Sequence, residues 1–197
     1  MKKTRNYDKY EDYTKYQLTK TLDKTKIKKW QNEEWQVKID CFKKLFKVHI
    51  SDIDKSNKIL CLGSRTGQEV VAFQSFGKDK EVIGIDLHEF KPYTIIGDIH
   101  NLQFEDNYFD IEFTNIFDHS IYPEKFISEV HRTLKTGGIF ILHFQYKINQ
   151  DKYTETIITD IDKFKVLLKD KFEIISDNKL PSNITAMNYE IKLKKTK

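Results

Sequence analysis

One short turn in the sequence has the residue types and the position to bind a ligand through its backbone. Residues 63–67 read Gly-Ser-Arg-Thr-Gly, directly after the apolar run Lys58–Leu62 and directly before a helical pattern. Glycines in such a turn let backbone N–H groups and the N-terminus of the helix approach a ligand. The turn differs from the dinucleotide pattern G-x-G-x-x-G, because Arg65 and Gln68 stand where two of its glycines would be. A pyrophosphate therefore has a poor cradle here.

Two carboxylates follow the next two apolar runs and extend this ligand site. Asp86 ends the second run, 23 residues after Gly63, and Asp98 follows Gly97 behind the third. An acidic residue about 20 residues beyond such a turn accepts hydrogen bonds from ribose hydroxyls. In open α/β sheets ligands bind outside the carboxyl ends of the strands. The order and spacing predict a ligand that carries a nucleoside but no diphosphate.

Apolar runs and helical patterns alternate along the chain and place these residues at the ends of strands. We expect strands at residues 58–62, 81–86, 93–96, 109–114, 139–144, 172–176 and 189–193. We expect helices at residues 30–46, 68–76, 123–134 and 161–168. Strands that alternate with helices imply a sheet with parallel strands at its centre and helices on both faces. The last two strands could form a hairpin through Pro181 and Asn183.

Length and composition narrow the class of protein. A chain of 197 residues with 39% hydrophobic and 32% charged residues suits a globular protein of one or two domains. Its apolar runs are far shorter than the ~18 residues of a membrane span, and no apolar segment follows the basic start. Cys41 and Cys61 form neither a disulfide framework nor a zinc spacing, so we expect no metal. We expect an intracellular, cytoplasmic monomer without membrane contact, with the nucleus left open.

The two ends of the chain are basic and the centre is acidic. Residues 1–29 carry a net charge of +6 and residues 192–197 one of +4, which leaves −6 for residues 30–191. Tyr7, Tyr10, Tyr13 and Tyr16 recur every third residue within the first segment, which lacks an apolar period. Such ends either bind a polyanion such as nucleic acid or only keep the chain soluble. We expect residues 1–29 to precede a domain of residues 30–197 and to recruit or cover the substrate. The segment either docks on the body as a helix or stays mobile until a partner orders it.

Five short motifs follow one another in a fixed order between Lys58 and about Phe144. They are Ile59-Leu60-Cys61-Leu62-Gly63-Ser64-Arg65-Thr66-Gly67, Gly84-Ile85-Asp86, Gly97-Asp98-Ile99, Leu102-Gln103-Phe104-Glu105-Asp106-Asn107-Tyr108-Phe109-Asp110 and Glu129-Val130-His131-Arg132-Thr133-Leu134-Lys135-Thr136-Gly137-Gly138. With this series the chain resembles the class I S-adenosylmethionine-dependent methyltransferases, in particular the small type 11 group. The resemblance implies an α/β, Rossmann-like fold: a mostly parallel seven-stranded sheet with helices on both faces and an antiparallel last strand.

The resemblance also implies a cofactor, S-adenosyl-L-methionine, and residues that bind it. The matching positions are Gly63, Ser64, Arg65, Gly67, Asp86, Leu87, Asp98, Ile99 and Asn115. In the family, the residue matching Asp86 holds the ribose diol, and the one matching Asp98 accepts a hydrogen bond from the adenine amino group. Ile99 would pack near the adenine ring, and the two turn glycines would line the methionine and ribose. Asn115 would lie beside the methionine end and the methyl acceptor.

The sequence departs from the family at two positions of the first motif. The family usually carries an acid where this chain has Cys61 and a glycine where it has Arg65. The missing carboxylate removes a contact to the ammonium group of the cofactor. Arg65 either pairs with the cofactor's carboxylate or narrows the pocket.

Methyl transfer from a sulfonium is an in-line displacement, so the enzyme mainly supplies proximity and alignment. A base is needed only where the acceptor must lose a proton. The local candidates are His119 as the base and Asp118 as the group that orients it, just after the fourth strand. Equally, His119 could be a loop histidine with structural hydrogen bonds. Residues 115–118 do not resemble the Asn-Pro-Pro-Tyr signature of enzymes that methylate amino groups of nucleic acids.

The sequence leaves the acceptor open. It could be a small molecule, a protein side chain, or an RNA end reached by the basic ends of the chain. Two alternatives to an active methyltransferase also stay open. One is an inactive domain that binds the cofactor or S-adenosylhomocysteine and serves a partner, and the other is a nucleic-acid-binding module that uses the basic ends.

Overall fold

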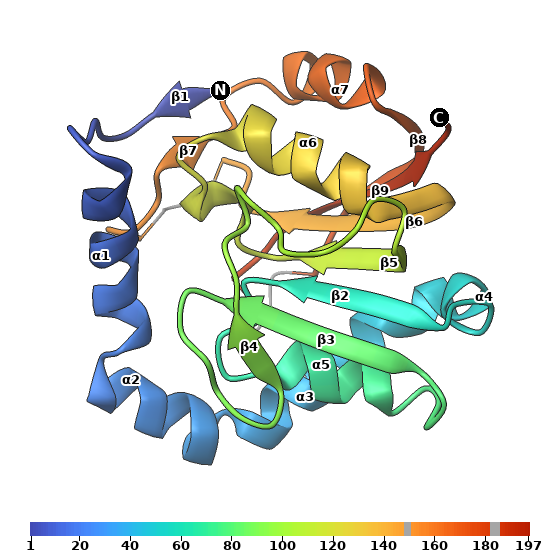
Figure 1. The fold of residues 1–197 in the computed structure, drawn as a ribbon, viewed down its shortest axis with the longest axis horizontal. Coiled ribbons are helices and arrows are strands. Elements are labelled where there is room, and N and C mark those ends of the chain that lie inside the picture. Colours follow the sequence, from blue (N-terminus) through green and yellow to red (C-terminus); the bar gives the residue numbers. More distant parts are fainter. Residues whose placement is uncertain (148–150, 182–185) are drawn as a thin grey trace.

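A seven-stranded sheet forms the centre of the computed structural model, which describes residues 1–147, 151–181 and 186–197 (Figure 1). The strands lie in the order β4-β3-β2-β5-β6-β9-β8. They are β2 (Lys58–Leu62), β3 (Glu81–Asp86), β4 (Thr94–Ile96), β5 (Phe109–Thr114), β6 (Leu134–Phe144), β8 (Phe172–Lys179) and β9 (Tyr189–Lys195). Strands β4, β3, β2, β5 and β6 pair in parallel, whereas β9 is antiparallel to both β6 and β8. The expected Rossmann-like fold with an antiparallel last strand is confirmed.

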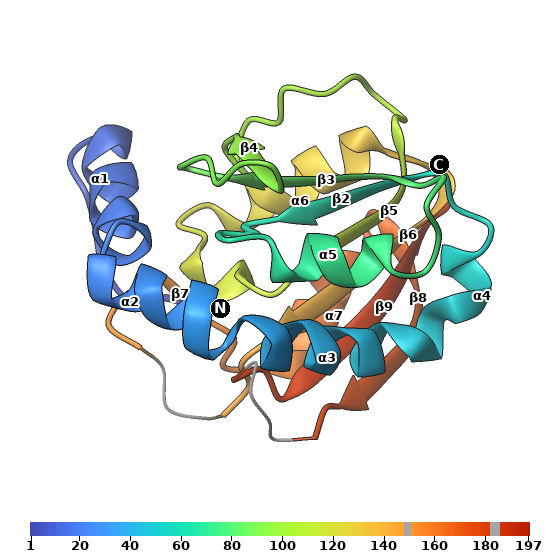
Figure 2. The same ribbon diagram turned by 90° about the horizontal axis from the view of Figure 1, so that it is seen from below.

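Helices cover both faces of this sheet (Figure 2). They are α3 (Trp35–Phe46), α4 (Ile50–Ile53) and α5 (Gln68–Gln74) on one face, and α6 (Pro123–Thr133) and α7 (Ile161–Lys169) on the other. Short 3-10 turns cover Lys47–His49 and Phe117–His119. In the part of the chain that the structure describes, no helix is long and apolar enough to cross a membrane.

Side chains that alternate along the strands divide the core into two apolar clusters. In β2, Leu60 and Leu62 belong to the cluster under α6 and α7, whereas Ile59 and Cys61 belong to the cluster under α3, α4 and α5. This alternation follows from the two-residue period of a strand. Because both faces of β2 are covered, the strand reads as a continuous apolar run, as expected for a buried parallel strand.

The helix expected to begin at Trp30 begins instead at Trp35. A π-helical turn, Lys29–Glu33, precedes it and buries the Trp30 side chain. The expected hairpin is present, since β8 and β9 pair along their length. Pro181 lies between them, and Asn183 lies outside the described residues.

Residues 1–29 form two helices and a short strand. Strand β1 (Lys2–Lys3) pairs with β7 (Thr156–Ile157), and α1 (Tyr10–Thr21) and α2 (Lys24–Lys28) follow. We expected this segment either to dock as a helix or to stay mobile until a partner orders it, because it has no apolar period. The structure places α1 against the body through Tyr13, Gln17 and Thr21, which are all buried. Two of these three residues are polar, which is why hydrophobicity alone gave no signal.

Candidate functional site

The turn after β2 brings its backbone against the end of β3. The N–H groups of Gly63 and Ser64 both donate to the carbonyl oxygen of Ile85, at 2.9 Å each. Gly63 and Gly67 have φ angles of +73° and +92°, in the left-handed region that favours glycine. A Cβ at Gly63 would lie only 2.2 Å from Cγ1 of Ile116. The position therefore requires glycine, which keeps its backbone open to the cavity beside it.

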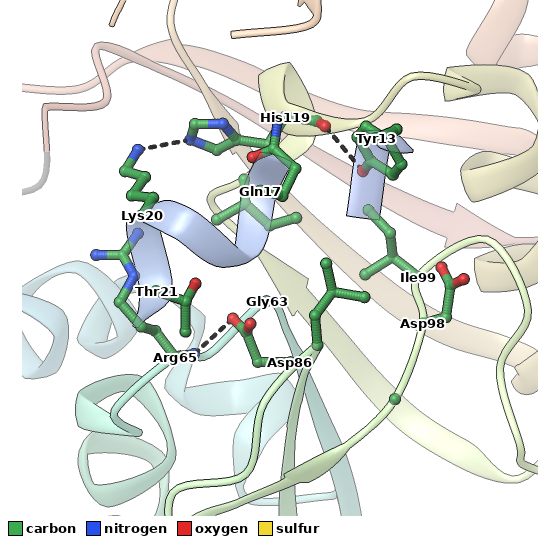
Figure 3. A pocket seen from close by; sticks show the side chains of 13 residues that line it. Tyr13, Gln17, Lys20, Thr21, Gly63, Arg65, Asp86, Asp98, Ile99 and His119 are labelled. Atoms are coloured by element: carbon green, nitrogen blue, oxygen red, sulfur yellow. Dashed lines mark hydrogen bonds between the residues drawn. The ribbon is translucent and has the colours of Figure 1, made fainter. Parts of the chain in front are cut away.

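Asp86, the last residue of β3, binds the same turn. Its carboxylate accepts a hydrogen bond from the backbone N–H of Arg65 at 3.0 Å. Burial raises the pKa of Asp86, although the Arg65 guanidinium and the backbone N–H groups of Arg65 and Leu87 act in the opposite direction. Asp86 thus places a half-buried carboxylate on the wall of a cavity (Figure 3).

Asp98 already has hydrogen-bond partners from two directions. The Tyr10 hydroxyl lies 2.8 and 2.7 Å from its two carboxylate oxygens, and the backbone N–H of His100 donates at 2.8 Å. Burial pushes the pKa of Asp98 upward, but the bonds from His100 and Tyr10 outweigh this and leave the pKa below its usual value. The Asp98 carboxylate, which was expected to accept a hydrogen bond from the adenine amino group, is therefore already bonded to Tyr10 of α1.

These residues meet at a small cavity of about 60 Å³. We call Gly63, Asp86, Leu87, Asp98 and Ile99, which line it from the carboxyl ends of the strands, the strand-end rim. A benzene molecule needs a cavity of roughly 150 Å³, so the present cavity is too small for a nucleoside. Side chains around the cavity must move before a nucleoside can bind.

The opposite wall of this cavity comes from the start of the chain. Tyr13, Gln17, Lys20 and Thr21 of α1 line it, and we call residues 4–29 the N-terminal cover. The Tyr13 hydroxyl donates to the carbonyl oxygen of His119 at 3.0 Å, as Figure 3 shows. Gln17 donates to the carbonyl oxygen of Tyr153 at 3.0 Å. The tyrosine repeat had singled out Tyr13, and residues 1–29 were expected to recruit or cover the substrate. Nothing placed Gln17, Lys20 and Thr21 in a pocket, and the only signal was the helical spacing of residues 13, 17 and 21.

A larger cavity of about 340 Å³ adjoins the first. Both are lined by Lys20, Gly63, Arg65, Ile116 and His119. The larger cavity is further lined by Ser64, Gln68, Glu69, Asn115, Lys26, Lys29, Trp30, Lys38, Phe42, Gln145, Asp151, Ala186 and Met187. Its lining includes five Lys or Arg side chains against two carboxylates. The larger cavity is therefore suited to an anionic ligand.

The predicted base, His119, lies between the two cavities. Its Nδ1 is 2.9 Å from the carbonyl oxygen of Tyr153, so this nitrogen carries the hydrogen in the assigned tautomer. Its Nε2 then accepts from Nζ of Lys20 at 3.1 Å. Burial lowers the pKa of Lys20, with Arg65 adding to the effect and the ion pair with Asp151 opposing it. The Nε2 lone pair of His119 thus accepts from Lys20, whose ammonium group also pairs with Asp151.

Asp118 does not orient His119, and this part of the prediction is wrong. Its carboxylate accepts from the Thr154 hydroxyl at 3.3 Å, and its other oxygen has no partner among the described residues. The carbonyl of Tyr153 takes the place that Asp118 was expected to fill at Nδ1. The reason is the 3-10 turn at 117–119, which buries Asp118 away from the cavities that His119 lines.

The structure brings together most of the predicted cofactor residues. Around the smaller cavity lie Gly63, Arg65, Asp86, Leu87, Asp98 and Ile99, and around the larger one Gly63, Ser64, Arg65 and Asn115. Gly67 lines neither, because its left-handed backbone starts α5 and packs on Tyr93. Among the described residues no group of His, Cys, Asp and Glu side chains is arranged to hold a metal ion.

Comparison with known proteins agrees with this arrangement. Residues 60–142 match the family described as "Methyltransferase domain". The structure is similar to a Burkholderia thailandensis 1,6-didemethyltoxoflavin-N1-methyltransferase solved with S-adenosylhomocysteine, at 13% identity, a TM-score of 0.66 and coverage of 92% of this chain and 90% of that one. It is also similar to the PH0226 protein of Pyrococcus horikoshii OT3 (20% identity, TM-score 0.62, coverage 77% and 88%).

A third similar structure is a putative methyltransferase of Bacillus halodurans C-125, with 16% identity, a TM-score of 0.57 and coverage of 75% of this chain and 99% of that one. At these identities the solved structures indicate a shared fold. No curated protein matches the chain.

Proposed function

We propose that the chain is a class I S-adenosylmethionine-dependent methyltransferase that methylates a small acidic molecule bound in the larger cavity. The match of residues 60–142 to a methyltransferase domain supports the activity. The observation that carries this proposal is the wall that the two cavities share, formed by Gly63, Arg65, Ile116 and two further side chains. A molecule in one cavity lies next to a molecule in the other. Methyl transfer needs this proximity and little else from the protein.

The strand-end rim fits the cofactor. Gly63 lines both cavities, and Asp86 offers a carboxylate for the ribose hydroxyls. Asp98 would accept from the adenine amino group once Tyr10 shares or releases it. When bound, the cofactor supplies an electrophilic methyl group on a sulfonium. The chain's own residues bind it, align it and exclude water.

The charge of the larger cavity supports an acidic acceptor. Lys26, Lys29 and Lys38 belong to the wall of this cavity. Lys29 and Lys38 share one carboxylate partner, Glu34, at 2.9 Å each, so the wall keeps an excess of positive charge. A carboxylate or phosphate on the acceptor would be attracted to it. Trp30 offers an apolar surface beside these lysines, and a cavity of about 340 Å³ suits a small molecule.

His119 is the candidate proton acceptor where the acceptor atom carries a proton. Its Nε2 lines both cavities and is bonded to Lys20. Lys20 also pairs with Asp151. That ion pair can hold the lysine in place when the substrate takes its position at the imidazole of His119. The role of His119 then resembles that of a general base positioned by a backbone carbonyl at its other nitrogen.

The test is incubation of the protein with cofactor labelled in the methyl group and with cell extract separated into protein, RNA and small molecules. We expect label in small molecules that an anion-exchange column retains. The reaction should be weaker with Lys26→Glu and unchanged with Lys78→Glu, which alters an exposed lysine outside both cavities. Label in protein, RNA or unretained small molecules would contradict the acidic acceptor, and no label would support an inactive cofactor-binding domain.

A further inference from the structure

Glu69, the second residue of α5, places a carboxylate in the wall of the larger cavity. The residue is only 6% exposed. Its Oε1 accepts from Nδ2 of Asn115 at 3.3 Å, and its Oε2 has no hydrogen-bond partner among the described residues. A buried carboxylate oxygen without a partner is unfavourable. A hydrogen-bond donor that reached Oε2 would remove this cost.

Burial and two nearby cations have opposite effects on the pKa of Glu69. Burial raises the pKa of Glu69 to about 7, while Arg65, Lys38 and the bond from Asn115 oppose this rise. Near neutral pH the carboxyl group is thus close to the midpoint between its two forms. A cation that arrives at Oε2 stabilises the charged form, and its binding then expels a proton.

Arg65 lies in the wall of the same cavity and offers the opposite charge. Its backbone is held by Asp86, but its guanidinium lies 4.1 Å from the centre of the Trp30 ring and has no ion-pair partner in the described part of the chain. The stack on the indole fixes the direction of the guanidinium and leaves its N–H groups available. The lining of the cavity thus contains both the Glu69 carboxylate and the Arg65 guanidinium.

A ligand group that carries an ammonium and a carboxylate on neighbouring atoms matches this pair. We propose that Glu69 and Arg65 bind the amino-acid end of the cofactor, with the α-ammonium group on Oε2 of Glu69 and the α-carboxylate on the guanidinium of Arg65. The proposal rests on the proposed function only through its cofactor. It assigns to a helix residue, Glu69, the carboxylate that Cys61 cannot provide, since that thiol is fully buried and burial raises its pKa well above the usual value.

The assignment has a consequence for ligand selection. An adenosyl compound without the amino-acid end, such as 5′-methylthioadenosine, makes the contacts of the strand-end rim but not those of Glu69 and Arg65. The two residues therefore contribute only to the affinity for S-adenosylmethionine and S-adenosylhomocysteine. The rim contributes to the affinity for all three compounds.

Calorimetric titration with S-adenosylhomocysteine and with 5′-methylthioadenosine tests this division. Glu69→Gln keeps the shape of the side chain, and we expect it to weaken S-adenosylhomocysteine about tenfold or more. Binding of 5′-methylthioadenosine should change less than twofold. Glu124→Gln, on the exposed start of α6, serves as the matched control and should change neither affinity.

The pH dependence of the wild-type protein gives a second measurement that needs no variant. Because the ammonium binds the deprotonated carboxylate, affinity for S-adenosylhomocysteine should rise about tenfold from pH 6 to pH 8, on either side of the Glu69 pKa of about 7. Arg65, Lys38 and Cys61 lie near the same carboxylate, and burial raises the pKa of the Cys61 thiol well above its usual value. His119 lines the cavity as well, so the profile must flatten in Glu69→Gln to be assigned to Glu69.

The outcomes separate this inference from the function on which it rests. Equal loss of both ligands in Glu69→Gln, or no loss of either, would overturn the assignment of Glu69 and leave the cofactor site in place. A profile that keeps its slope in the variant would do the same. If the wild-type protein binds neither compound, the proposed function fails together with the inference.

Discussion

The strand-end rim and the N-terminal cover face each other across one cavity, but only the rim is supported by the core. Leu62 and Ile85, which precede the rim residues of β2 and β3, are members of an apolar cluster. Among the described residues neither cluster contains a residue before Phe42. The cover is attached by polar contacts, such as Tyr13 to His119 and Gln17 to Tyr153. A wall built on the sheet cannot move without unfolding, whereas a wall held by hydrogen bonds of about 1 kcal/mol each can.

A chain that begins at Lys29 tests this comparison most directly. We expect it to melt cooperatively, because both apolar clusters are complete without residues 1–28. Methyl transfer should fall by about 100-fold or more, since the cavities lose Tyr13, Gln17 and Lys20. Circular dichroism and methyl-label incorporation measure the two effects. An unfolded product would show that the cover belongs to the core, and full activity would show that it is dispensable.

Gly67→Ala and Gly137→Ala test how firmly the rim's turn is tied to the sheet. Both glycines have positive φ, +92° and +81°, but a Cβ at Gly67 would lie 2.3 Å from Cβ of Tyr93, and one at Gly137 would meet nothing within 4 Å. We expect Gly137→Ala to cost about 1 kcal/mol of unfolding free energy from the backbone alone. Gly67→Ala should cost about 3 kcal/mol, because overpacking adds to the strain. Urea unfolding of the pair measures the difference, and equal losses would contradict a crowded turn.

Asp86→Ala removes the carboxylate that we propose binds the ribose. We expect affinity for S-adenosylhomocysteine to fall about tenfold to 100-fold, since a charged acceptor is worth roughly 1.5–3 kcal/mol. Asp54→Ala, an exposed acid outside both cavities, should leave the affinity unchanged. Calorimetric titration gives both values. Unchanged binding in Asp86→Ala would refute the placement of the cofactor on the rim.

Tyr10→Phe makes the smallest change and acts on the cover alone. The variant frees Asp98 from the hydroxyl that it binds in this structure. We expect S-adenosylhomocysteine to bind about threefold tighter and the melting temperature to fall by roughly 2–4 °C. Tyr16→Phe is the matched control, because the Tyr16 hydroxyl donates to the backbone carbonyl oxygen of Lys152 at 2.9 Å and does not touch the rim. Weaker binding in Tyr10→Phe would mean that the hydroxyl supports the ligand instead of competing with it.

The rim could be predicted from the sequence because its parts are local. Each of its residues follows a short apolar run, and the parallel register brings the ends of those runs together. The glycine turn and the spacing to Asp86 are visible without any knowledge of distant contacts. The match between predicted and observed strands follows from the continuous apolar character of buried parallel strands.

The cover could not be predicted because its contacts are distant and polar. Tyr13 binds a carbonyl 106 residues away and Gln17 one 136 residues away. The same applies to the error at Asp118, since the carbonyl that binds His119 lies 34 residues further on. No periodicity links such partners. Glu69 was missed for another reason: its significance lies in the partner that one of its oxygens lacks, which only a structure can reveal.

Because β1 pairs with β7, the N-terminal cover is attached to the body at both of its ends. At one end Lys2 and Lys3 pair with Ile157 and Thr156, and at the other Trp30 is buried ahead of α3. A segment attached at one end could move away from the cavity by rotating about that end. A segment attached at both ends must first lose one of its attachments. The two-residue strand β1 is the weaker attachment, because both of its residues are exposed whereas Trp30 at the other end is buried. We therefore expect ligand exchange to begin with the release of the N-terminus. A protein fused to Met1 should change the association and dissociation rates of ligands more than their equilibrium affinity.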